Sequence, residues 1–116
     1  MKKTLLAFTL LVSFAITAKA QDTLRNPADY RTHLSKVATL CDVVYQVKVI
    51  SDTVTYLYMG GNVPHQKFTI AVKGNKLQLD WANLKNKHLC VTGTVVMYKN
   101  TIQVIAFEPG HIKVDQ

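Results

Sequence analysis

The chain has 116 residues, which is the length of a single domain, so a two-domain organisation is excluded. It carries 14 basic and 7 acidic side chains, and 48% of its residues are hydrophobic. A basic excess of this size does not by itself identify nucleic acid as a ligand.

The first twenty residues have the layout of a cleaved export signal. Two lysines precede an apolar run from Leu5 to Ile16, and Ala18 and Ala20 supply the small side chains that a signal peptidase requires. The run is too short to span a bilayer as a permanent helix. We expect residues 1–20 to be removed from an exported product, periplasmic or secreted; the alternative is a structural helix. Removal takes three lysines and no acid, which lowers the net charge from +7 to +4.

Two cysteines, Cys41 and Cys90, are separated by 49 positions. In the oxidising compartment to which an export signal leads, they would tend to pair, and free buried thiols are the alternative. A zinc site is not predicted, because Cys41 has no neighbouring histidine and the spacings typical of zinc ligands are missing. No metal and no cofactor are expected.

The first half of the chain predicts an arm and two strands. Residues 21–33 are polar and are expected to form an N-terminal arm before a single domain over residues 34–116. A long first strand is predicted from Lys36 to Ile50, and a second from Thr53 to Met59, because both runs are rich in β-branched and aromatic residues. In the first strand one face is expected to carry Val43, Tyr45, Val47 and Val49, and the other, partly wet, Asp42, Gln46 and Lys48.

The middle of the chain predicts a loop, a third strand and a short helix. Gly60 to Gln66 contains two glycines and a proline and is expected to be a loop. Lys67 to Lys73 alternates as a third strand, with a buried face and a solvated face. The buried face is Phe68, Ile70 and Val72, and the solvated face is Lys67, Thr69, Ala71 and Lys73. Residues 77–87 are expected to hold one or two helical turns that start at Trp81 and are capped by Asp80.

The last two predicted strands run from His88 to Tyr98 and from Thr101 to Phe107. Lys99 and Asn100 between them have the spacing of a tight hairpin, and Gly93 predicts a bend or bulge in the fourth strand. The expected fold is therefore all-β, with five strands and one short helix before the fourth.

Five strands with a helix between the third and fourth describe the OB-fold, a five-stranded Greek-key β-barrel. Specific residues strengthen this expectation: residues 55–61 (TYLYMGG), 63–69 (VPHQKFT), 89–93 (LCVTG), 98–100 (YKN) and 102–104 (IQV). In order and spacing they resemble the OB-fold modules of exported bacterial proteins, some of which stand alone and some of which are attached to secreted nucleases. The resemblance covers roughly residues 34–114 and departs from the family pattern at Asp42, Val63, His65 and Asn100.

The resemblance favours a disulfide, because the family has cysteines at positions that match Cys41 and Cys90. The first and fourth strands of an OB barrel run antiparallel. Cys90, near the start of the fourth strand, therefore meets Cys41 only if the first strand begins well before it, close to Lys36.

The resemblance also implies a ligand site on the outer face of strands two and three and on the adjoining loops. The candidate residues are Lys48, Lys67, Lys73 and Lys99 for phosphates, Tyr56 or Tyr58 for stacking against a base, and Asn62, His65 and Gln66 at the rim. Two alternatives stay open: the tyrosines belong to the core, and the lysines only solvate a sheet face. Trp81 is expected to plug the barrel end.

Catalysis is not predicted. The four histidines are spread over the chain, the acids fall in different elements, and no catalytic motif is present. The expected function is that of a non-enzymatic, exported binding module whose ligand is an oligonucleotide, single-stranded or irregular. The rival class is an envelope module that has a structural role or recognises a protein, peptide or glycan.

Overall fold

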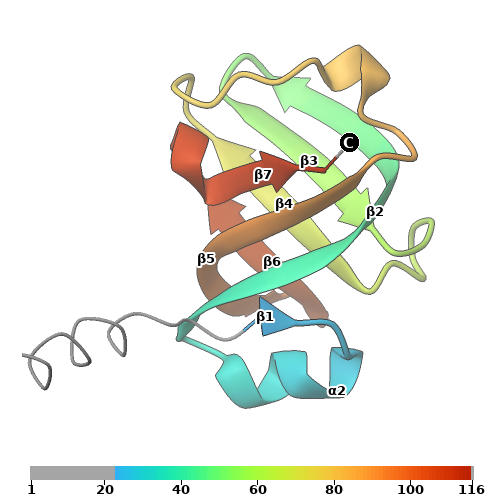
Figure 1. The fold of residues 1–116 in the computed structure, drawn as a ribbon, viewed down its shortest axis with the longest axis vertical. Helices are drawn as coiled ribbons and strands as arrows, with labels where there is room; N and C mark the ends of the chain where they lie inside the picture. Colours follow the sequence, from blue (N-terminus) through green and yellow to red (C-terminus); the bar gives the residue numbers. More distant parts are fainter. Residues whose placement is uncertain (1–22, 116) are drawn as a thin grey trace, which may run out of the picture.

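The computed structural model describes residues 23–115 (Figure 1). The signal peptide expected over residues 1–20 lies outside these residues. The strands are β1 (Thr23–Leu24), β2 (Val37–Ser51), β3 (Val54–Met59), β4 (Phe68–Lys73), β5 (His88–Tyr98), β6 (Thr101–Ala106) and β7 (Ile112–Val114). The helical segments are α2 (Pro27–Tyr30) and the 3-10 turns η1 (Arg31–His33), η2 (Trp81–Asn83) and η3 (Pro109–His111).

The seven strands form one sheet in the order β1-β2-β3-β4-β6-β5-β7, and β2 also pairs with β5. Hydrogen bonding therefore runs around a ring through β2, β3, β4, β6 and β5 and returns to β2. The long β2 makes this possible, because its residues 37–43 pair with β5 and its residues 44–51 pair with β3. The β4–β6 pair is parallel, and the other pairs of the ring are antiparallel.

All five predicted strands are present, but the sheet has seven strands because β1 and β7 were not predicted. Runs of two or three residues are too short to show the alternation that identifies a strand. The helix predicted within residues 77–87 is only the three-residue turn η2, and Asp80 makes no capping hydrogen bond. The α-helix of the described chain, α2, lies instead in the predicted N-terminal arm, where Asn26 caps it.

The four residues predicted to share one face of the first strand do not share it. Val47 and Val49 pair with Leu57 and Thr55, which are buried, so both point to the inner side of the sheet as expected. Tyr45, in contrast, is 41% exposed, and its neighbour Val44 is fully buried. The cause is a bulge: the register shifts between Val44 and Gln46, so Tyr45 is an extra residue that has no partner on β3. An extra residue reverses the side to which later side chains point.

The predicted solvated face of β4 is also wrong in part. Thr69 and Ala71 are buried together with Phe68, Ile70 and Val72, and Lys73 at the end of the strand is exposed. Because β4 lies between β3 and β6, neighbouring side chains cover both of its sides.

The interior is apolar and extends to the N-terminal segment. Tyr30 of α2 is fully buried, and its ring meets the ring of Phe68 edge-on at 5.4 Å. This contact attaches α2 to one end of the molecule, opposite the end that carries η2 (Figure 1). The other fully buried large side chains are Leu40, Val44, Leu57, Met59, Ile70, Leu89, Val91, Val95 and Val104.

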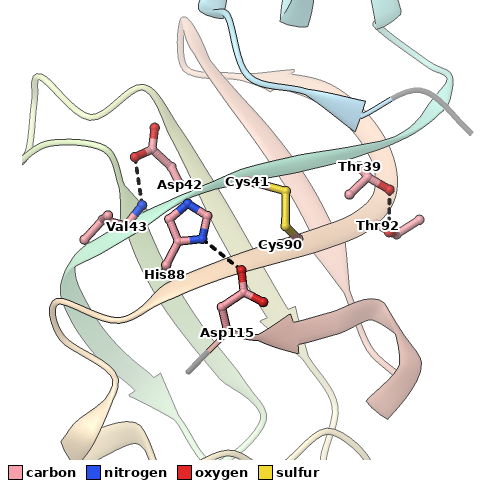
Figure 2. The surroundings of a disulfide bond; sticks show 8 residues. All are labelled: Thr39, Cys41, Asp42, Val43, His88, Cys90, Thr92 and Asp115. Atoms are coloured by element: carbon pink, nitrogen blue, oxygen red, sulfur yellow. Dashed lines mark hydrogen bonds and ion pairs between the residues drawn. A yellow bond between two sulfur atoms is a disulfide. The ribbon is translucent and has the colours of Figure 1, made fainter.

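The predicted disulfide is confirmed. Cys41 of β2 and Cys90 of β5 lie directly opposite each other in the antiparallel ladder and are bonded through their sulfurs (Figure 2). β2 begins at Val37, as the bridge requires. On one side of the bridge the hydroxyls of Thr39 and Thr92 are 2.7 Å apart.

Gly93 marks a close approach of two strands rather than a simple bend. A Cβ at this position would lie 2.5 Å from the carbonyl oxygen of Ile105 and 3.1 Å from a methyl group of Val104, both on β6. Gly93→Ala is therefore expected to lower the free energy of unfolding by about 1–3 kcal/mol, because β5 and β6 must separate. Urea denaturation measures this loss.

Gly110→Ala is the matched control, because nothing lies within 4 Å of a Cβ built there. Its effect is expected to stay within about 0.5 kcal/mol. Equal effects of the two substitutions would contradict the close approach of β5 and β6.

Candidate functional site

A cleft of about 310 Å³ opens on the outer face of β3, β4 and β6. We call it the tyrosine cleft; its lining is Tyr56, Tyr58, Val63, Gln66, Thr69, Tyr98, Lys99, Thr101 and Gln103. Its volume is at the lower end of the roughly 300–1,000 Å³ typical of ligand pockets.

Strand pairing builds the floor of the cleft. Tyr58 lies opposite Thr69, and Thr69 lies beside Gln103, so one row of outward side chains crosses β3, β4 and β6. Directly paired residues point to the same side of a sheet. The row begins with an aromatic ring and continues with hydroxyl and amide groups.

The two tyrosines of β3 face outward. The inward positions of this strand are Thr55, Leu57 and Met59, which are buried, whereas Tyr56 and Tyr58 are partly exposed. The two phenol rings meet edge-on with centroids 6.4 Å apart. Burial, together with the neighbouring Tyr56, raises the pKa of Tyr58. The expectation of outward tyrosines therefore holds over the alternative in which they belong to the core.

A tight turn supplies the third tyrosine. Lys99 and Asn100 have φ values of 51° and 65°, as a two-residue hairpin turn requires. The turn places Tyr98 opposite Thr101 at the cleft wall. Tyr98 is 47% exposed, and the Lys99 ammonium lies 5.3 Å from the centre of its ring, within the range of a cation–π contact.

Gln66 brings the loop before β4 into the cleft. Its Nε2 donates to the hydroxyl of Thr69 at 3.2 Å, while its Oε1 is buried and has no hydrogen-bond partner. An unpaired buried polar atom of this kind costs the folded state about 1–3 kcal/mol.

The four predicted lysines do not act together. Lys99 lines the cleft, and Lys48 borders it because it pairs with Tyr56 across β2 and β3. Lys67 instead forms an ion pair with Asp42 at 3.5 Å. Lys73 lies at the opposite end of β4, beside Val54, about 20 Å along the strand from Lys67.

The two remaining loop candidates do not line the cleft. Asn62 and His65 are exposed, and the backbone N–H of His65 donates to the carbonyl of Asn62 at 2.6 Å. These residues shape the loop that carries Val63 and Gln66 into the cleft.

Sequence reasoning did not find Tyr98, Thr101 and Gln103 of the cleft. Their place depends on the parallel pairing of β4 with β6, which joins segments far apart in the chain. The tight hairpin was the one local signal, since it makes Tyr98 and Thr101 neighbours across the turn.

The charge of the cleft has one sign. Among residues 23–115, the side chains that line it include the cation Lys99 and no carboxylate. Elsewhere in the same residues, no three His, Cys, Asp or Glu side chains gather closely enough to hold a metal ion. The described chain also has no helix with the length and apolar character needed to cross a membrane.

A comparison of the chain with models of protein families finds no match. A comparison with curated proteins finds no relative of significant similarity.

Proposed function

We propose that this chain is a non-enzymatic, exported binding module of the OB-fold class, and that its tyrosine cleft binds single-stranded nucleic acid. The ring of β2, β3, β4, β6 and β5 supports the OB-fold assignment, with β1 and β7 as short additions. The Cys41–Cys90 bond is compatible with export, because disulfides persist in oxidising compartments.

The observation that carries the ligand proposal is the combination of rings and charge in one cleft. Tyr56, Tyr58 and Tyr98 offer π-faces on which bases can stack, and base–aromatic stacking is tolerant of sequence. Lys99 within the cleft and Lys48 at its border attract phosphates. A glycan or peptide could also contact the aromatic and amide groups of the cleft. The cleft, however, is lined by a lysine and no carboxylate among the described residues, and this positive charge favours a polyanion.

The test is fluorescence anisotropy with a labelled oligothymidylate of about 8 nucleotides at several salt concentrations. We expect saturable binding that weakens with salt. The slope of log K against log salt concentration should be about −1.4 or steeper, because two phosphate contacts on a single strand give a slope of that size. Neutral oligosaccharides and a duplex of equal length are the comparison ligands.

Absence of binding at low ionic strength would overturn the nucleic-acid proposal, and so would binding that ignores salt. Tight, salt-independent binding of a glycan or peptide would instead establish the rival class of envelope module.

A further inference from the structure

A second, smaller pocket adjoins the tyrosine cleft. We call this pocket of about 170 Å³ the arginine pocket; its lining is Pro27, Tyr30, Arg31, Pro64, Gln66, Lys67, Asn100, Thr101 and Ile102. It shares Gln66 and Thr101 with the tyrosine cleft, so the two sites are neighbours. Pro27 and Tyr30 of α2 and Arg31 of η1 supply one wall of the pocket.

Two residues that line this pocket each carry a buried polar atom with no hydrogen-bond partner. The two atoms are the hydroxyl of Tyr30, a residue that is fully buried, and Oε1 of Gln66. Burial and the nearby Asp42 carboxylate raise the pKa of Tyr30 to about 12, so its hydroxyl remains a neutral donor. The Thr69 hydroxyl can donate a hydrogen bond as well as accept one. When the Gln66 amide is rotated by half a turn, Oε1 accepts from this hydroxyl, and Nε2 takes the unpaired position, where it is a donor.

The charges at the pocket are also unbalanced. Lys67 is paired with Asp42 at 3.5 Å, whereas Arg31 is exposed and forms no ion pair with the residues described. A guanidinium can bind two oxygens of one oxyanion at once. Asn100 and Thr101 add an amide and a hydroxyl to the same wall.

We propose that the arginine pocket is a phosphate site, with Arg31 as the charged ligand and Gln66 and Asn100 as hydrogen-bond donors. It holds the phosphate that adjoins a base stacked in the tyrosine cleft. This second statement rests on the proposed function, whereas phosphate binding by the pocket does not. A bound oligonucleotide would then run from Tyr98 over Thr101 to Arg31.

The pocket is tested directly by NMR, with backbone amide shifts recorded during titration with inorganic phosphate, thymidine and thymidine monophosphate. Inorganic phosphate should shift the amides of Arg31, Asn100 and Thr101, and thymidine should shift those of Tyr56 and Tyr98. The monophosphate should shift both groups. If inorganic phosphate leaves the first group unmoved, the phosphate site is wrong whether or not oligonucleotides bind.

The link between the two sites is tested with Arg31→Gln in the anisotropy assay. We expect about tenfold weaker binding at low salt and a slope of log K against log salt that is smaller by about 0.7, because one phosphate contact is lost. Arg25→Gln is the matched control, since Arg25 lies on the same exposed segment but lines neither pocket. Equal slopes for the two variants would overturn the phosphate site and leave the proposed function standing.

Discussion

The double variant Cys41→Ala, Cys90→Ala is expected to lose about 4 kcal/mol of unfolding free energy. The bridge closes a loop of 49 residues, and in the chain-entropy model a loop of that size restricts the unfolded chain by this amount. The loop contains β3, β4, η2 and the second half of β2. Urea denaturation of the variant and of the oxidised parent measures the difference.

The control for this loss is Thr39→Val with Thr92→Val, which removes the neighbouring cross-strand hydrogen bond and keeps the sulfur bond. Its cost is expected to be about 1 kcal/mol. If the cysteine variant loses no more than the threonine variant, the bridge contributes little to stability.

The second large effect concerns the tyrosines. Tyr56→Leu with Tyr98→Leu should weaken oligonucleotide binding by at least about 30-fold, since each stacked base contributes about 1–3 kcal/mol. Leucine keeps apolar bulk at both partly exposed positions, so the fold should persist. Anisotropy measures the affinity, and thermal unfolding verifies the fold.

Tyr45→Leu is the matched control for these two substitutions. Tyr45 is 41% exposed and, like the cleft tyrosines, lies on the surface. It occupies the β2 bulge and does not line the cleft. Its replacement should leave affinity unchanged. A similar loss for Tyr45→Leu would mean that binding is not confined to the tyrosine cleft.

The parts of the fold that the sequence predicted are those set by local pattern. Alternation identified the five long strands, and the two-residue spacing at Lys99–Asn100 identified the hairpin, in which both residues have positive φ. The disulfide followed from the two cysteines and the family resemblance, and the start of β2 at Val37 meets the geometric requirement.

The features that the sequence did not predict depend on long-range pairing. The bulge at Tyr45 becomes visible only when β2 is aligned with β3, and it separates Tyr45 from Val47 and Val49, with which it was expected to share a face. The parallel β4–β6 contact buries Thr69 and brings Gln103 beside it. Likewise the Lys67–Asp42 ion pair joins two elements whose proximity no local pattern indicates.

Photo-cross-linking tests the tyrosine cleft most directly. A single-stranded oligonucleotide that carries 5-iodouracil is irradiated with the protein, and the modified residues are identified by mass spectrometry. The account predicts adducts at Tyr56, Tyr58 or Tyr98, and fewer of them at high salt. Adducts concentrated at Tyr45 or Phe107, or no adduct under conditions of saturating oligonucleotide, would contradict it.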